Sequence, residues 1–153
     1  MLALNGMKIE VLATGCGSAC VSASTCITID GGRTNHPDQL ELHSFVGGSE
    51  ATGFIINSNR SISLTNPCGG PCQGTITFTV RRPAPYNTDI PIVSGATIGI
   101  NIPAGTTAST AYSITLQGNT VLSGFGVIVT ATFKCDGDTG SGVSVSSEEK
   151  QMP

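Results

Sequence analysis

The six cysteines are the residues of this chain that most clearly indicate a chemical role. They are Cys16, Cys20, Cys26, Cys68, Cys72 and Cys135. Thiols form disulfides or bind metal ions, and six in 153 residues is a high count for a protein of a reducing compartment. The count allows many pairings, so the sequence alone does not choose between three bonds within one chain and bonds that join two chains.

The positions of the cysteines give some guidance. Cys68 and Cys72 flank Gly-Gly-Pro between two segments with strand patterns. We predict a bond within the chain here, provided that the two Cα atoms come within about 7 Å of each other. Cys16 and Cys20 lie in a run of Gly, Ser, Ala and Thr whose side chains are too small to bury a core. This run indicates a flexible arm, whose thiols either fold back or reach another molecule.

Zinc is the other chemistry open to these residues, because both close pairs have the spacing Cys-x3-Cys and zinc sites use pairs two to four residues apart. Neither pair has a zinc-knuckle pattern, and the two histidines, His36 and His43, stand in a different segment. Asp136 and Asp138 begin a sequence like a calcium loop, but its later ligands are missing. We therefore predict disulfides, with no metal and no cofactor.

Catalytic motifs are not found. Asp38 and Glu41 stand near the two histidines, but a serine–histidine–aspartate site would have to be assembled in space from abundant serines. The sequence has no nucleophile elbow, phosphate loop or zinc-protease helix. We predict that the protein is not an enzyme.

Glycan binding is the main alternative function, because sandwiches and jelly rolls often serve as lectin modules. The chain has no Trp, and its two tyrosines are Tyr86 and Tyr112. Arg81, Arg82, Tyr86 and Asn87 are a candidate polar cluster for such a site. We expect this cluster to be a linker between strands, because prolines at 83 and 85 prevent a central strand there.

Composition restricts the partners. Only 11% of the residues are charged, against about a quarter in ordinary soluble domains. The net charge is −3 and no basic block is present, which argues against nucleic acid. No apolar run has the length of a membrane span. The start of the sequence is not a classical signal peptide, because it lacks a basic region and Lys8 and Glu10 interrupt its apolar stretch.

Alternating apolar and polar residues predict a series of short strands with Gly, Pro and Asn between them. The expected strands cover residues 7–11, 25–30, 40–46, 52–57, 61–65, 75–80, 98–102, 112–116 and 125–133, with a hairpin loop at 58–60. This pattern indicates an all-β fold, a single antiparallel jelly roll or β-sandwich. We predict an N-terminal arm at 1–24, the sandwich at 25–135 and a disordered polar tail at 136–153.

The order of these features resembles the subunits of bacterial endospore appendages, over roughly residues 16–135. The resemblance rests on a cysteine-bearing arm, then Cys26-Ile-Thr-Ile-Asp30, Ala51-Thr-Gly-Phe-Ile-Ile56, Phe78-Thr-Val-Arg-Arg82 and the late Cys135. It implies jelly rolls that join sheet edges into a fibre, with N-terminal connectors bonded to other subunits. Carried over by position, Cys16 and Cys20 would be the connector cysteines, and Cys26 and Cys135 their partners on the body. The family's connector cysteines are adjacent, whereas these are spaced, and the Cys68/Cys72 pair has no counterpart.

From these features we expect a structural subunit that polymerises with copies of itself into an extracellular, disulfide-cross-linked fibre. Exposed strand edges with few charges would pair between subunits. The expected location is a spore or cell surface outside the cell, reached without a classical signal peptide. A secreted or phage-surface jelly-roll binding module for a glycan or a surface is the alternative.

Overall fold

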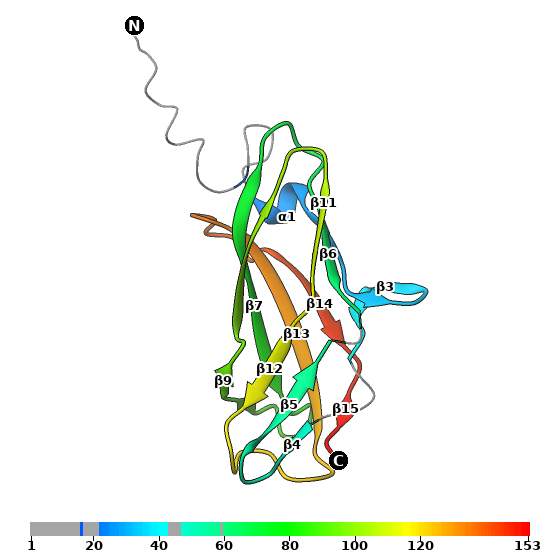
Figure 1. Ribbon diagram of the computed structural model, residues 1–153, viewed down its shortest axis with the longest axis vertical. Coiled ribbons are helices and arrows are strands. Elements are labelled where there is room, and N and C mark those ends of the chain that lie inside the picture. The colour runs from blue at the N-terminus through cyan, green and yellow to red at the C-terminus, as the bar shows by residue number, and fades with distance from the viewer. Residues whose placement is uncertain (1–15, 17–21, 43–46, 59) are drawn as a thin grey trace, which may run out of the picture.

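The computed structural model describes residues 16, 22–42, 47–58 and 60–153 (Figure 1). Most of the expected arm, the expected strand at 7–11, and the side chains of Cys20 and His43 therefore lie outside the described residues. One short helix, α1 (Ala23–Cys26), precedes the first strand. The strands are β1 (Thr28–Asp30), β2 (Gly32–Arg33), β3 (His36–Leu40), β4 (Gly47–Ser49), β5 (Gly53–Asn57), β6 (Ile62–Thr65), β7 (Cys72–Arg81), β8 (Asp89–Ile90), β9 (Ile92–Ser94), β10 (Thr97–Ile102), β11 (Thr107–Thr110), β12 (Ser113–Leu116), β13 (Gly126–Cys135), β14 (Val143–Ser147) and β15 (Lys150–Gln151).

The largest sheet has the strand order β10-β7-β13-β14-β3-β2. At its centre β7 and β13, ten residues each, run antiparallel along the long axis of the molecule (Figure 1). β8 extends the sheet beside β7, and β15 extends it beside β13. The pairing is antiparallel throughout this sheet except between β14 and β3, which are parallel. The predicted all-β sandwich is confirmed.

Two smaller sheets, β1-β6-β11 and β4-β5-β12-β9, face the large one. They continue each other, because β6 follows β5 and β12 follows β11 along the chain. Both connections break at the same level, where the Ser58 amide donates a hydrogen bond to the Tyr112 carbonyl at 2.9 Å. The Tyr112 amide in turn donates to Ser58 Oγ at 3.1 Å. The expected hairpin at 58–60 is therefore wrong, since β5 and β6 are successive segments in two sheets and do not pair with each other.

The core lies between the layers and follows the predicted alternation. Ile76, Phe78 and Val80 of β7 are buried, with threonines between them facing out. On β13 the buried set is Val127, Val129, Ala131 and Phe133. Each large apolar side chain that is fully buried contributes about 1.5–3 kcal/mol relative to an exposed one. Phe78 also packs across the layers against Tyr112, with ring centroids 4.8 Å apart.

The C-terminal residues are part of the sandwich, so the predicted disordered tail at 136–153 is wrong. β14 fills the place between β13 and β3, and Val145 is 4% exposed. Met152 is 2% exposed, and its amide donates to the Phe125 carbonyl at 2.8 Å. The serines that make this segment polar alternate with Val143 and Val145, which is the pattern of a strand with one wet face.

Two smaller expectations also change. The strand expected from Thr25 begins only at Thr28, after the single turn of α1. The Ile27 amide closes this turn by donating a hydrogen bond to the Ala23 carbonyl at 3.0 Å. The stretch between the strands expected at 25–30 and 40–46 contains β2 and the start of β3, with a turn at Thr34 and Asn35. Asn35 has φ +63°, a backbone region that Asn tolerates better than most residues.

Candidate functional site

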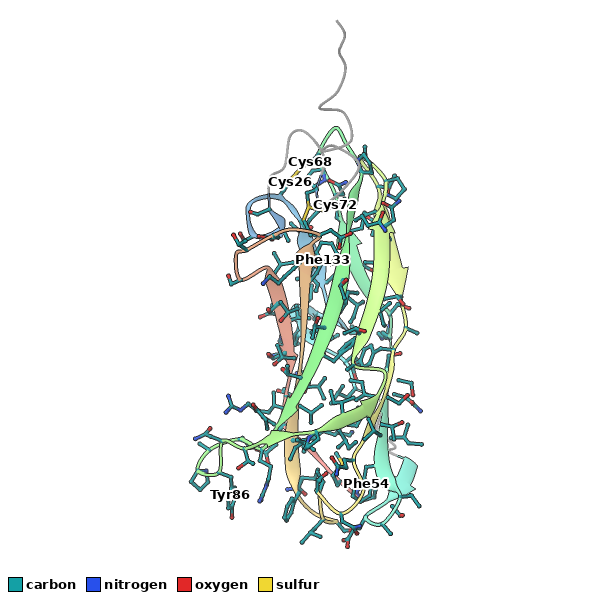
Figure 2. All side chains as sticks on the ribbon, turned by 90° about the vertical axis from the view of Figure 1, so that its left-hand side faces the viewer. Cys26, Phe54, Cys68, Cys72, Tyr86 and Phe133 are labelled. Atoms are coloured by element: carbon teal, nitrogen blue, oxygen red, sulfur yellow. A yellow bond between two sulfur atoms is a disulfide. The ribbon has the colours of Figure 1, made fainter. Side chains whose placement is uncertain are left out.

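All five described cysteines gather at one end of the sandwich (Figure 2). Cys72 begins β7 and Cys135 ends β13, so antiparallel pairing of these strands brings both to the same end. Cys26 ends α1, and Cys68 lies in the loop that leads from β6 to β7. Cys20 lies outside the described residues. The reactive cysteine side chains of the described chain are therefore concentrated at this end of the sandwich.

Cys68 forms a disulfide with Cys26, whose Cα atom lies 7.1 Å from that of Cys68. The predicted bond between Cys68 and Cys72 is therefore not the one in the structure. The reason is that β6 and β7 belong to different sheets. The loop between them crosses from layer to layer, so it is not a hairpin tip, and Cys68 faces the turn of α1 instead.

Cys16, Cys72 and Cys135 form a second group, the cysteine triad, whose three sulfur atoms lie within 4.8 Å of one another. Cys16 stands at bonding distance from both body cysteines, with Cα separations of 3.8 Å to Cys72 and 5.6 Å to Cys135. Sγ of Cys72 and Sγ of Cys135 are 3.1 Å apart. A sulfur atom in a disulfide has one sulfur partner, so Cys16 bonds to one of the two while the other lies against the bond.

Asn66 holds the loop that carries Cys68. Its side chain is fully buried and makes three hydrogen bonds. Nδ2 donates to the carbonyls of Gly70 at 2.9 Å and Ile102 at 3.0 Å, and Oδ1 accepts from the Cys68 amide at 3.0 Å. A buried amide with all these partners fixes the loop at low cost, because its polar atoms are satisfied. In the sequence, the flanking residues Thr65 and Pro67 do not indicate that Asn66 has this role.

Asp138 holds the other side of the same end. Its Oδ2 accepts a hydrogen bond from the Ala23 amide at 3.1 Å, at the start of α1, and its Oδ1 accepts from the Gly140 amide at 2.8 Å. The prediction of a disordered polar tail from residue 136 missed this contact, since the two ends of the bond are 115 residues apart. Asp138 thus ties the segment after β13 to the turn that carries Cys26.

A second feature is the edge formed by β9, β10 and β11, the open edge. Among the described residues, each of these strands pairs on one side only, β9 with β12, β10 with β7 and β11 with β6. The sequence contains no Asp, Glu, Lys, Arg or His from Ile90 to Phe133. The open edge therefore has none of the charged residues with which proteins ordinarily protect edge strands from pairing with other chains.

The outward-facing backbone groups of β10 can be assigned. The Phe78 amide donates to the Ala96 carbonyl at 2.8 Å. Because bonded and non-bonded residues alternate in an antiparallel pair, the even-numbered residues of β10 bond to β7. Thr97, Gly99 and Asn101 then direct their N–H and C=O groups away from the sheet, and within the described ranges these groups have no backbone partner.

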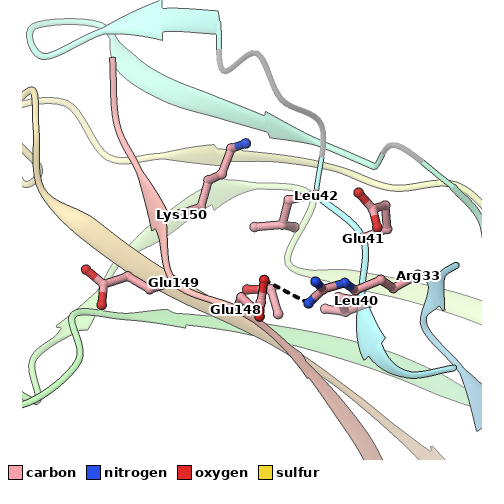
Figure 3. Close-up of a pocket in the computed structure, with 8 residues that line it drawn as sticks. Arg33, Leu40, Glu41, Leu42, Glu148, Glu149 and Lys150 are labelled. Carbon is pink, nitrogen blue, oxygen red and sulfur yellow. Dashed lines mark ion pairs between the residues drawn. The ribbon is translucent and has the colours of Figure 1, made fainter. Parts of the chain in front are cut away.

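Charge is concentrated on the opposite side of the large sheet. Arg33 forms an ion pair with Glu148 at 2.8 Å, between β2 and the segment after β14. An open pocket of about 200 Å³ lies there, where β14 and β3 separate (Figure 3). It is lined by Arg33, Leu40, Glu41, Leu42, Ser147, Glu148, Glu149 and Lys150. The positively and negatively charged side chains of this pocket protect this side of the large sheet from pairing with other chains. His36 and Asp38 are exposed nearby on β3.

Hydroxyl groups cover both outer faces, and many of them bond to each other across neighbouring strands. Ser63 pairs with Ser109 at 2.8 Å and Thr65 with Thr107 at 2.9 Å on the β6–β11 face. On the large sheet, Thr130 pairs with Ser146 and Thr132 with Ser144, both at 2.7 Å. These pairs make the faces polar without charge.

The polar cluster proposed for glycans is an ordered loop between β7 and β8. The guanidinium of Arg82 lies between the rings of Tyr86 and Phe125, 3.7 Å and 3.6 Å from their centroids. Arg81 donates to the Asn87 carbonyl at 2.9 Å. Tyr86 is 59% exposed, but one face of its ring is covered by Arg82. This arrangement leaves a poor stacking platform for a sugar.

Tyr112 is the other tyrosine and is buried at the break between the two small sheets, with no hydrogen-bond partner for its hydroxyl among the described residues. Burial raises the pKa of this phenol, and the charge of Glu41 adds to the effect. A sugar cannot reach this ring, so its role is packing.

In the described part of the chain, no helix is long and apolar enough to cross a membrane. No family model, no curated protein and no solved structure matches the sequence or the fold.

Proposed function

We propose that this protein is a structural subunit that self-assembles with copies of itself into an extracellular fibre cross-linked by disulfides. The observation that carries the proposal is the open edge, which combines unpaired backbone groups with a run of 44 residues, Ile90–Phe133, that contains no charged side chain.

Unpaired strand edges bind other strands through main-chain hydrogen bonds. Natural monomers prevent this with lysines, prolines or bulges at the edge. The exposed residues of β10 are instead Thr97, Gly99 and Asn101, which leave the backbone accessible and cost less to desolvate than charged residues would. A strand from a second copy can therefore extend the large sheet at β10.

The cysteine end offers the covalent part of the assembly. In a single chain Cys16 lies against its own Cys72 and Cys135. An identical contact made by Cys16 of one copy with Cys135 of another would leave the body of each sandwich unchanged, as in domain swapping. Cys16, Cys20 and Cys135 are the candidates for bonds between chains, whereas Cys26, which the sequence also suggested, is bonded to Cys68 of its own chain. Such bonds would make the stability of the fibre kinetic and dependent on reductant.

The test is a pair of substitutions at Gly99. Gly99→Pro removes one outward N–H and places a ring at the edge, without removing a bond to β7. Gly99→Ala is the matched control, since a Cβ at this position meets nothing within 4 Å and the N–H is kept. Electron microscopy should show fibres for the wild type and for Gly99→Ala, and single particles for Gly99→Pro.

Circular dichroism of the Gly99→Pro protein should give the spectrum and melting temperature of the wild type, which separates loss of assembly from loss of folding. Fibres of wild-type length formed by a folded Gly99→Pro protein would exclude β10 as the joining edge. A wild type that stays monomeric under oxidising conditions would exclude the fibre and leave a binding module.

A further inference from the structure

We propose that Cys16, Cys72 and Cys135 form a thiol–disulfide exchange site, in which the N-terminal segment is bonded to one body cysteine and released or transferred by the other. The inference goes beyond the fibre proposal, because it concerns the chemistry of a single subunit and holds whether or not the protein polymerises.

The geometry brings together what exchange requires. Exchange proceeds when a thiolate attacks a sulfur of a neighbouring disulfide, through a mixed disulfide. Here two body sulfurs, 3.1 Å apart, both lie beside Cys16. They are held on the first residue of β7 and the last of β13, the two most extensively paired strands of the sandwich. Cys16, in contrast, comes from the segment that precedes α1.

The reaction needs no oxidant. Starting from a Cys16–Cys135 bond, the Cys72 thiolate attacks Sγ of Cys135. The Cys72–Cys135 bond forms, the Cys16–Cys135 bond breaks, and Cys16 leaves as a thiolate that takes up the proton lost by Cys72. Attack on Sγ of Cys16 instead gives a Cys16–Cys72 bond and a Cys135 thiolate. Each step keeps one disulfide and one thiol.

Sulfur spacing favours this chemistry over metal binding. Two thiolates bound to one zinc ion at about 2.3 Å in tetrahedral geometry are separated by about 3.8 Å. Sγ of Cys72 and Sγ of Cys135 are closer than that, at 3.1 Å. The Cys26–Cys68 bond serves as an internal reference, because in the described chain it is outside the triad.

A released Cys16 thiolate can attack the corresponding disulfide of a second copy. In the fibre proposed above, an arm bonded to its own body before assembly would thereby change to a bond between chains with the number of disulfides unchanged.

The test uses the full-length oxidised protein at a dilution where it is monomeric. It is incubated at pH 8, quenched in acid, alkylated with N-ethylmaleimide and mapped by mass spectrometry with fragmentation that separates Cys16 from Cys20. Trypsin cuts after Lys134, so Cys135 leaves on its own peptide. We expect Cys135 bonded to Cys16 in one fraction of the molecules and to Cys72 in another. The rate at which the fractions interconvert should fall about tenfold for each pH unit below the thiol pKa, because the thiolate is the attacking form.

Two variants give the controls. Cys72→Ser should hold Cys16 on Cys135 alone, and Cys135→Ser should hold it on Cys72 alone, with interconversion lost in both and the Cys26–Cys68 bond unchanged. A single fixed pairing of the triad in the wild type at pH 8 would overturn the proposal, including one in which Cys20 holds the third sulfur in every molecule. Stoichiometric zinc, released by a chelator together with three alkylatable thiols, would also overturn it.

Discussion

The Cys26–Cys68 bond should be a main determinant of stability at the cysteine end. The two residues are 42 positions apart in the sequence. In the chain-entropy model, a crosslink that closes a loop of this length stabilises the folded state by about 4 kcal/mol. For a domain of this size each kcal/mol moves the melting temperature by about 2–4 °C, so the double change Cys26→Ala with Cys68→Ala should lower it by about 8–16 °C.

The single variants sharpen this test. Either one breaks the same bond, so Cys26→Ala, Cys68→Ala and the double variant should melt at nearly the same temperature. A bond between Cys68 and Cys72 would close a far shorter loop worth about 2 kcal/mol, and Cys26→Ala would then have no effect through that bond. The measurement is thermal unfolding followed by circular dichroism, with and without reductant.

In reductant the melting temperatures of the wild type and the double variant should approach each other. The difference in melting temperature that persists measures the packing of the Cys68 side chain, which is 7% exposed. An oxidised double variant that melts within about 2 °C of the wild type, or losses of melting temperature that add between the two single variants, would contradict a stabilising Cys26–Cys68 bond.

Two further changes test other parts of the structure. Met152→Ala should cost about 2–5 kcal/mol in a denaturant titration, because Met152 is buried at the end of the C-terminal segment; an unchanged midpoint would mean that this segment is the tail expected from the sequence. Tyr112→Phe should leave the free energy of unfolding unchanged at pH 7, since the buried hydroxyl has no partner among the described residues. At high pH the variant should be more stable than the wild type. Burial raises the phenol pKa in the folded state, so the wild type loses stability as pH rises above about 10, the ordinary value, and equal alkaline unfolding of the two proteins would contradict this assignment.

Local alternation was enough to predict the central strands. The run from Thr75 to Val80 alternates without interruption, and its apolar residues are all buried. The set from Val127 to Phe133 behaves in the same way. These strands are long and have one wet face, so their pattern repeats often enough to be recognised.

Features that depend on distant partners could not be predicted. The disulfide partner of Cys68 is set by the crossing of its loop between sheets, which no local pattern records. Asp138 finds its role only when β13 brings it beside Ala23. Strand β14 contains two apolar residues among serines, so its own pattern is weak. It forms a strand because it pairs with the side of β13 that β7 does not occupy. The cysteines were recognised as the reactive residues, but their grouping into a pair and a triad required the fold.

The attachment of Cys16 to the ends of β7 and β13 also determines how tension enters the molecule. A pull on the chain ahead of Cys16 passes through a covalent bond into strands that run the length of the sandwich. The two strands share eight residue pairs, so tension along their axis acts on the ladder in shear and is spread over many hydrogen bonds at once. The small helix and the outer strands are bypassed. The sandwich is thereby suited to transmit tensile force, with resistance to unfolding set by its most strongly paired strands.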